Sequence, residues 1–250
     1  MSGVFQVGED AYDDFMGRYS VQLAPLFAEF AGVGEGDRAL DVGAGTGALT
    51  AELLRRGADV TAAEPSPSFT QALRTRFPAI DVHEAPAERM PFDDDAFDVA
   101  LAQLVVAFME DAPTSIREMA RIARTVAVCM WGVEEMEMFA AIGRTSQTVG
   151  GSTETGARRY RTRAELVALL EEGGLQGIEA AELDVTASYT GFDDFWHALS
   201  AQVGPAGAWL KALDDEKRAI AHDEMFRQLG SPAGAFELSG RAYAVRATRA

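Results

Sequence analysis

The sequence predicts an α/β fold built around a mostly parallel sheet, and two observations predict it. From about residue 37 onward, short apolar runs alternate with helical patterns, which is typical of repeated βα units. The first apolar run leads into a loop of alternating glycines, which lies where open parallel sheets bind their ligands. The chain has 250 residues, and this length fits one such domain.

Each strand is expected where a short apolar run is bounded by polar residues or glycine. The run at 97–106 is apolar enough to be covered on both faces of the sheet. The expected strands are 38–42, 60–63, 80–83, 97–106, 126–131, 178–185 and 236–247.

The expected helices are recognised by periodic apolar residues and by their end signals. One begins with Ser66 as its N-cap and Pro67 at the first helical position, where the missing N–H costs nothing. Another begins at Thr162, which has capping-box spacing to Glu165. The expected helices are 48–56, 66–77, 113–124, 162–172 and two stretches around 195–203 and 209–229.

The sequence shows no clear linker and no internal repeat, so we expect one domain over residues 1–250. Residues 1–36 are expected to form a helical cover. The pattern loosens at 132–161, which we interpret as an insertion above the sheet. Met130, Met136, Met138 and Phe139 suggest a flexible lid there, although a buried helix face would explain them nearly as well.

Composition and charge argue against several classes of partner and location. The formal net charge is −17, with 39 acidic and 22 basic side chains, and this sign opposes binding to nucleic acid or to anionic membranes. Cys129 is the single cysteine and fits a reducing compartment. The first residues lack the pattern of a signal peptide, and the apolar run at 99–109 is too short to span a bilayer. We therefore expect a cytoplasmic protein.

Three glycines, Gly43, Gly45 and Gly47, alternate directly after the first strand and before a helix. Glycine is needed where the backbone turns sharply and a ligand comes close to the main chain. Gly43 and Gly45 together with Ala48 also satisfy the dinucleotide fingerprint loosely. The glycines alone therefore leave the ligand open.

Two acidic residues narrow the choice of ligand. Glu64 ends the second strand, where a carboxylate can accept both hydroxyl groups of an adenosine ribose. Asp41 would add negative charge beside a pyrophosphate, and it suits a ligand with an ammonium and a sulfonium group. The alternative is that Asp41 caps the loop through backbone N–H groups, which is compatible with a ligand role.

With these motifs, the sequence resembles the class I S-adenosylmethionine-dependent methyltransferases, especially their small-molecule, type 11 branch. The resemblance implies a Rossmann-like, doubly wound sheet of about seven strands, the last antiparallel, with helices on both faces and helical lid additions. It extends from about residue 12 to 131, with a weaker match at 160–175. The segments that carry it are Asp41-Val-Gly43-Ala-Gly45-Thr-Gly47, Glu64-Pro65-Ser66, Ala87-Glu88-Arg-Met-Pro91-Phe92 before Phe97-Asp98, and Tyr12-Asp-Asp-Phe-Met16-Gly-Arg18-Tyr-Ser20.

The resemblance also implies contacts to S-adenosylmethionine and to its product, S-adenosylhomocysteine. The loop backbone would approach the methionine part of the cofactor, and Glu64 would bind the ribose. Pro65, Ala87 and Glu88 would contact the adenine. Arg18 would pair with the cofactor carboxylate. The implied cofactor-binding residues are Tyr12, Met16, Arg18, Asp41, Gly43, Ala44, Gly45, Glu64, Pro65, Ala87, Glu88, Gln103 and Leu104. The family often has Gly-Asp where this chain has Ala85-Pro86, which leaves Glu88 as the acidic contact to adenine.

No catalytic residue is assigned, because methyl transfer from a sulfonium needs mainly alignment and exclusion of water. His197 is the best candidate for a general base, but a structural role explains it better. Tyr19, Phe108 and Trp131 are expected to form an apolar wall of the acceptor pocket, with core packing as the alternative. The run Arg158, Arg159, Arg161 and Arg163 fits an anionic acceptor or, more simply, a solvated loop. No metal site is predicted.

The sequence thus predicts methyl transfer from S-adenosylmethionine to a small organic acceptor. Two alternatives remain open: an NAD(P)-dependent reductase that uses the same glycine loop, and a homologue that binds S-adenosylmethionine without catalysis. The reductase lacks support because the chain has no Tyr-x-x-x-Lys pair. The sequence carries no signal for the acceptor's identity, the atom methylated or the oligomeric state.

Overall fold

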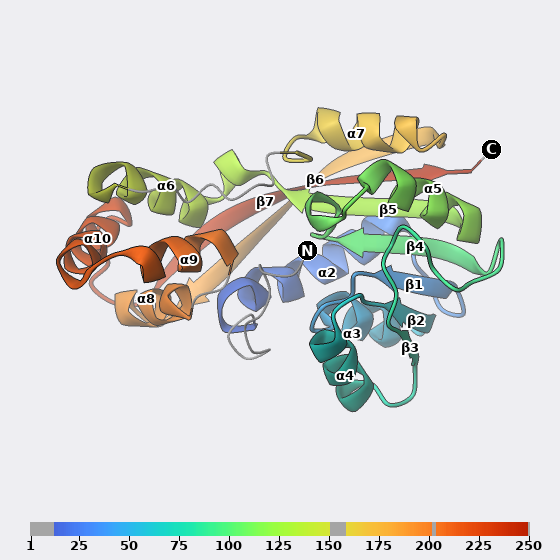
Figure 1. Cartoon of the computed structure of the whole chain (residues 1–250), viewed down its shortest axis with the longest axis horizontal. Helices are drawn as coiled ribbons and strands as arrows, with labels where there is room; N and C mark the ends of the chain where they lie inside the picture. Colours follow the sequence, from blue (N-terminus) through green and yellow to red (C-terminus); the bar gives the residue numbers. More distant parts are fainter. Residues whose placement is uncertain (1–12, 151–158, 202–203, 250) are drawn as a thin grey trace. The chain divides into compact units, whose positions relative to one another are not determined.

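One seven-stranded sheet runs through the computed structural model, which describes residues 13–150, 159–201 and 204–249. The strands are β1 (Arg38–Val42), β2 (Asp59–Ala63), β3 (Asp81–His83), β4 (Phe97–Gln103), β5 (Ala123–Trp131), β6 (Gln176–Tyr189) and β7 (Phe236–Thr248). Their order is β3-β2-β1-β4-β5-β7-β6 (Figure 1). The pairs from β3 to β5 are parallel, and β7 is antiparallel to β5. The predicted fold class is confirmed.

The strands and helices lie close to their predicted positions, with two corrections. The strand expected at 97–106 ends at Gln103, because Leu104 adopts a positive φ of 64° and turns the chain. The helix expected around 209–229 is two helices, because Asp214 starts a new one by accepting a hydrogen bond from the Lys217 N–H at 2.8 Å. The described helices are η1 (Asp13–Gly17), α2 (Arg18–Ala31), α3 (Ala48–Arg55), α4 (Pro67–Arg76), η2 (Val106–Phe108), α5 (Ala112–Ile122), η3 (Val133–Glu135), α6 (Glu137–Val149), α7 (Arg163–Glu172), α8 (Phe192–Ser200), α9 (Gly204–Ala212) and α10 (Asp215–Gln228).

The described residues divide between two compact units. We call residues 20–131, 159–183 and 242–249 the sheet unit. Residues 13–19, 132–150, 184–201 and 204–241 are the helical unit. The long strands β6 and β7 and the helix α2 contribute residues to both.

The core of the sheet unit follows from the alternation of side chains along a strand. Ala100 and Ala102 of β4 and Val126 and Val128 of β5 belong to one buried cluster with the apolar residues of α5 and α7. Residues between them, such as Leu101, are also buried but point to the opposite face. Figure 1 shows α5 over β5, with α7 beside α5. A sheet that is covered on both faces requires the continuous apolar strands that the sequence shows.

The helical unit has its own core, which is rich in aromatic residues. α6 packs against α10, and α8 contacts α9. Phe192 lies edge-on to Phe226 and to His222, with ring centroids 5.1 and 5.0 Å apart. Phe195 lies edge-on to Tyr189 at 5.3 Å. These pairs join α8, α10 and the end of β6 into one packed cluster.

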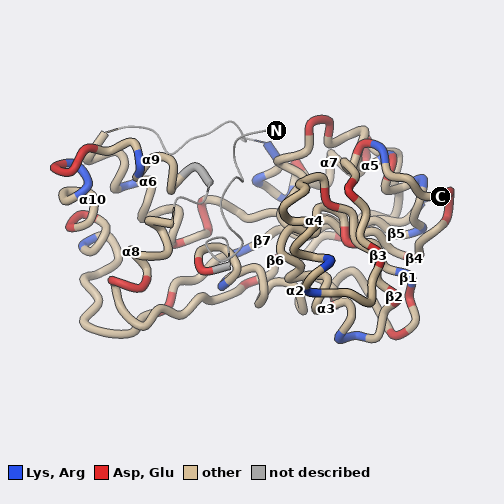
Figure 2. The backbone as a smooth tube through the Cα atoms, turned by 60° about the horizontal axis from the view of Figure 1, so that its bottom comes forward, with Lys and Arg blue, Asp and Glu red and all other residues tan. Residues whose placement is uncertain are grey.

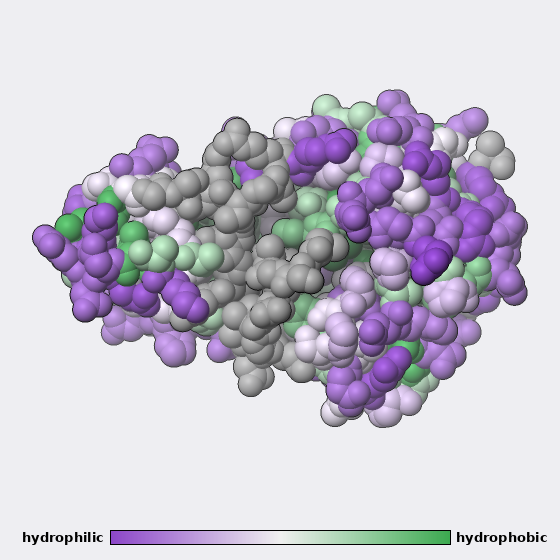
Figure 3. Space-filling model, viewed as in Figure 1, coloured by the Kyte–Doolittle hydropathy of each residue, from purple (hydrophilic) through white to green (hydrophobic). Residues whose placement is uncertain are grey.

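The surface of both units is polar and carries charges of both signs. Lys and Arg positions are interspersed with Asp and Glu positions along the described chain, as on α10 (Figure 2). The face of the sheet unit shown in Figure 3 is mainly hydrophilic, because the apolar sides of its helices face the sheet. Each helix within the described residues is too short or too polar to span a lipid bilayer.

Candidate functional site

The glycine loop between β1 and α3 is held against the end of β2. Gly43, Gly45 and Gly47 have φ values of 70°, 56° and 89°, a region that favours glycine. The Gly43 and Ala44 N–H groups both donate to the Ala63 carbonyl oxygen, at 2.7 and 3.3 Å. The loop therefore leaves the sheet at its carboxyl edge in a defined conformation.

The three glycines differ in what a side chain would meet. A Cβ atom at Gly43 would lie 3.0 Å from Val105, and one at Gly47 would lie 2.3 Å from Phe77. A Cβ atom at Gly45 would meet nothing within 4 Å. Gly43 and Gly47 are thus required by packing, whereas Gly45 faces open space that a ligand can occupy.

Glu64 connects this loop to the end of β2. Its side chain is buried, and its carboxylate accepts hydrogen bonds from the Gly45 N–H at 3.0 Å and the Ser66 N–H at 2.9 Å. Burial raises the pKa of Glu64, and the two backbone bonds oppose that rise. The carboxylate is therefore oriented beside the open space at Gly45.

Asp41 is a second buried carboxylate, in β1. Its Oδ2 accepts a hydrogen bond of 2.6 Å from the Thr50 hydroxyl in the first turn of α3. The pKa of Asp41 is raised to about 7, because burial and, to a smaller extent, the charge of Glu64 raise it more than the bonds from Thr50 lower it. Among the described residues, neither Asp41 nor Glu64 has an ion-pair partner.

The strand order reverses between β1 and β4, and ligands of open α/β sheets bind at such a switch point. Asp41 is in register with Leu101, so Gln103 ends β4 beside the glycine loop. The Gln103 amide donates to the Ser20 carbonyl oxygen at 3.2 Å, and its Oε1 is buried without a partner in the described part of the chain. Leu104 follows with its positive φ, and its N–H donates to the Cys129 carbonyl oxygen.

The segment predicted to meet the adenine is joined to the start of α5. One carboxylate oxygen of Glu88 accepts from the Glu110 and Asp111 N–H groups at 2.9 and 3.1 Å. Ala87 is buried, whereas Pro65 is exposed beside Glu64. The structure thus brings the predicted residues from Asp41 to Leu104 together in the sheet unit.

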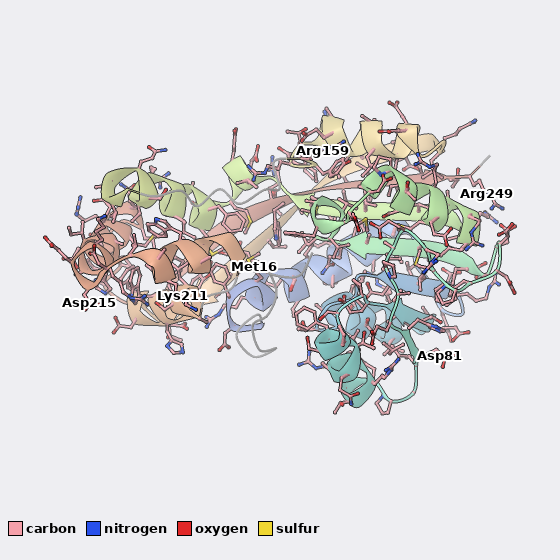
Figure 4. The ribbon with its side chains drawn as sticks, viewed as in Figure 1. Met16, Asp81, Arg159, Lys211, Asp215 and Arg249 are labelled. Carbon is pink, nitrogen blue, oxygen red and sulfur yellow. The ribbon has the colours of Figure 1, made fainter. Side chains whose placement is uncertain are left out.

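The predicted cofactor contacts near the N-terminus lie in the helical unit. Tyr12 lies outside the described residues. Met16 belongs to η1 and is buried (Figure 4). Arg18 pairs with both carboxylate oxygens of Asp194, at 2.6 and 3.0 Å, and lowers the pKa of Asp194 to about 2. The roles of these three residues in cofactor binding stay predictions.

The residues expected to line an acceptor pocket are divided between the units. Tyr19 is fully buried in the helical unit, where its hydroxyl lies 3.4 Å from the hydroxyl of Tyr189. Burial raises the pKa of Tyr19. In the sheet unit, Phe108 is half-buried against the core cluster and Trp131 is buried at the end of β5. Their role as an acceptor wall stays a prediction.

Two of the three histidines and the arginine run lie in different surroundings. His83 lies edge-on to Phe92 at 4.8 Å, and His197 is exposed on α8. Arg158 lies outside the described residues, and Arg159, before α7, stacks over the Tyr160 ring at 4.9 Å (Figure 4). Within the described residues, three or more potential metal-ligating side chains do not come together anywhere.

Sequence reasoning missed Thr50, the partner of Asp41. Thr50 is the third residue of the helix that follows the glycine loop. Backbone N–H groups in the first turn of a helix lack partners within the helix, and this position was the signal that could have identified Thr50. It also missed Val105 and Phe77, which require glycine at two positions of the loop. No spacing in the sequence reveals these two contacts.

Comparison with known proteins agrees with this geometry. A family model described as a methyltransferase domain matches residues 40–130. The demethylmenaquinone methyltransferase of Chlorobaculum parvum is 37% identical over 106 residues, which is 41% of this chain and 44% of that protein. The chain spans less than half the length of the curated relatives that it matches.

Solved structures share the fold over most of the chain. A candidate type II methyltransferase of Anaeromyxobacter dehalogenans has a TM-score of 0.68 and 21% identity, and the match covers 90% of this chain and 95% of the other. The [4+2]-cyclase SpnF has a TM-score of 0.58 and 20% identity, with 92% and 81% covered. At these identities the likeness shows the fold alone.

Proposed function

We propose that this protein transfers a methyl group from S-adenosylmethionine to a small organic acceptor, because residues 40–130 match a family model of a methyltransferase domain and the strand order is typical of class I, S-adenosylmethionine-dependent enzymes. The observation that carries the proposal is the open space at Gly45 beside the buried carboxylate of Glu64, at the switch point of the sheet, where β1 also carries the buried Asp41. An adenosine ribose and an ammonium group are suitable partners for these two acids.

We propose that residues of the sheet unit hold the cofactor along its length. The backbone at Gly43, Ala44 and Gly45 would approach its methionine part, with Asp41 toward the ammonium group. Glu64 would accept the ribose hydroxyls. Further along the site, Pro65, Ala87 and Glu88 would contact the adenine, and Gln103 and Leu104 would lie at the methyl-bearing side.

When bound, S-adenosylmethionine supplies an electrophilic methyl group on a sulfonium. The residues of this chain would hold the reacting groups in line and exclude water. Such positioning lowers a reaction barrier by on the order of 7–11 kcal/mol. Phe108 and Trp131 would exclude water at the acceptor side. A general base is needed only for a poorly nucleophilic acceptor such as a neutral hydroxyl group.

The fold by itself does not identify the reaction, since a [4+2]-cyclase shares it. A protein that binds S-adenosylmethionine without transferring its methyl group is therefore the second candidate. A reductase is the third, because the same loop and Glu64 suit a dinucleotide. Binding of S-adenosylhomocysteine or of NADH distinguishes the reductase from the other two candidates. Formation of a methylated product distinguishes the methyltransferase from the non-catalytic homologue.

The first experiment is isothermal titration of the full chain with S-adenosylhomocysteine and, separately, with NADH. We expect saturable binding of S-adenosylhomocysteine and none of NADH. Glu64→Ala should weaken that binding at least tenfold, because the ribose loses its acceptor. Glu171→Ala, which removes an exposed carboxylate of α7, is the matched control and should bind like the unchanged protein.

The second experiment measures S-adenosylhomocysteine release from S-adenosylmethionine in the presence of small phenols, amines and carboxylic acids. Acceptor-dependent release with a matching methylated product supports methyl transfer. Tight NADH binding in the first experiment would instead favour the reductase. Binding of S-adenosylhomocysteine without turnover of any acceptor class would favour the non-catalytic homologue.

A further inference from the structure

The carboxylate of Asp41 is held by Thr50 rather than by a cation. The Thr50 side chain is fully buried, and its hydroxyl donates to Oδ2 of Asp41 at 2.6 Å. The Thr50 backbone N–H, in the first turn of α3, bonds to the same carboxylate. A helix start favours a nearby negative charge. Both contacts therefore stabilise the charged form of Asp41 and orient it.

The other surroundings of Asp41 oppose its charge. Its neighbours in register on β2 and β4 are Ala62 and Leu101, which are apolar and buried. Glu64, after β2, is a second buried carboxylate. On α3 the nearest charged residue in sequence is Glu52, whose carboxylate is bonded to Arg55 and Arg56. The described residues thus place two buried acids together without a compensating cation.

Two buried carboxylates in one site favour retention of a proton by one of them. An ammonium group that enters the site supplies the missing positive charge, and the carboxyl group can then release its proton to solvent. The carboxyl group thus loses one proton when the ligand's ammonium group binds beside it. The net charge of the site is unchanged, because one positive charge leaves and another enters.

We propose that Thr50 is a positioning residue that holds Asp41 ready to ionise, and that cofactor binding releases the proton of Asp41. The inference rests on the proposed function, because it needs a ligand with an ammonium group at this site. It predicts that cofactor affinity rises with pH, and that this rise depends on the Thr50 hydroxyl. The raised pKa of Asp41 places the transition near pH 7.

The test is isothermal titration with S-adenosylhomocysteine from pH 5.5 to 7.5, in two buffers with different ionisation enthalpies at each pH. In this window an α-ammonium group stays mostly charged. We expect release of about one proton at pH 6 and affinity about tenfold weaker there than at pH 7.5. Asp41→Asn should abolish both the proton release and the pH dependence contributed by Asp41.

Three threonine variants separate positioning from packing. Thr50→Val keeps the shape but removes the hydroxyl, so the transition should move up by about one pH unit and affinity at pH 7 should fall about fivefold. Thr50→Ser keeps the hydroxyl and should restore the original pH profile. Thr145→Val removes a fully buried threonine hydroxyl in the helical unit and should leave the profile unchanged. Circular dichroism checks that each variant is folded.

The outcomes distinguish this inference from the proposed function. Absence of S-adenosylhomocysteine binding by the folded, unchanged protein at every pH would overturn both. Binding with no proton release would overturn the inference and leave the proposed function standing. Equal pH profiles for Thr50→Val and Thr50→Ser would overturn the positioning role of Thr50.

Discussion

At the scale of single residues, the unusual feature is a carboxylate that is buried among apolar strands and a second acid. Asp41 loses its proton near pH 4 when unfolded but near pH 7 when folded, because burial raises its pKa. Between these values the folded state binds more protons than the unfolded state. The contribution of Asp41 to stability therefore falls as pH rises, and its full cost, roughly 4 kcal/mol, is reached above pH 7.

Asp41→Asn is therefore expected to stabilise the cofactor-free protein at pH 8, because the amide keeps the shape without the buried charge. The stability difference from the unchanged protein should shrink steadily as pH falls from 8 to 5. Thermal unfolding at several pH values measures it. A difference that stays the same across this range would show that the pKa of Asp41 is not raised.

Two glycines of the same loop should respond differently to alanine. Gly47→Ala places a Cβ atom 2.3 Å from Phe77 at a φ of 89°, so we expect a loss of about 2–4 kcal/mol in stability. Gly45→Ala meets no neighbour, so it should cost only the strain at its φ of 56°, about 1 kcal/mol. Its larger effect should be on S-adenosylhomocysteine binding.

The control for the packing explanation is the pair Gly47→Ala with Phe77→Ala. If overlap with Phe77 causes the loss, the double variant should be more stable than the sum of the two single changes predicts. Additive losses would show that overlap with Phe77 does not cause the effect of Gly47→Ala. Unfolding by denaturant and titration with S-adenosylhomocysteine measure the two effects separately.

At the scale of helices and strands, the two predicted N-cap residues, Thr162 and Ser66, differ in the hydrogen bonds that they make. Thr162 and Glu165 form the predicted capping box at the start of α7, with the Thr162 hydroxyl accepting from the Glu165 N–H at 3.2 Å. Ser66 occupies the N-cap position of α4, but its side chain makes no capping bond and lies 3.0 Å from the Ser68 hydroxyl instead. The N-cap position predicted for Ser66 is confirmed, although its side chain forms no capping hydrogen bond.

Thr162→Ala should therefore destabilise the protein by about 1 kcal/mol, because one N–H group at the start of α7 loses its partner. Ser66→Ala should change stability by less than about 0.5 kcal/mol, since no cap is removed. Thermal unfolding of both variants beside Thr162→Ser checks the difference. Equal losses for the two alanine variants would contradict the assignment of the cap to Thr162 alone.

At the scale of the whole molecule, the proposed cofactor contacts from Asp41 to Leu104 belong to the sheet unit. The glycine loop, Glu64, Glu88 and Gln103 are all within it, whereas the aromatic cluster around Phe192 belongs to the helical unit. A ligand that binds the native state stabilises the segments it contacts against local opening.

Hydrogen exchange should accordingly slow on binding of S-adenosylhomocysteine in the segments around β1, α3 and the end of β2. The amides of α8 and α10 should change less. Mass spectrometry of peptides from both units, with and without the ligand, measures this contrast. Protection confined to α8 and α10 would place the ligand elsewhere and contradict the proposed site.

The order of strands and helices along the chain, the glycine loop and the acid at the end of β2 are all readable in the amino-acid sequence. These features are local: apolar periodicity reports which face of an element is buried, and glycine reports where the backbone must turn. The parallel sheet followed from the repeated βα pattern. The errors lie at element ends, such as Leu104, where a single residue changes the direction of the chain, and at 209–229, where Asp214 starts a second helix.

Which side chains meet depends on how the chain folds in three dimensions. Thr50 holds Asp41, Phe77 covers Gly47, and Arg18 pairs with Asp194, which lies 176 residues further along the chain. The division of the chain into two units likewise depends on contacts between segments that are distant in sequence. Periodicity specifies that a face is buried but not what covers it, because the partner depends on how surfaces distant in sequence come together as the chain folds.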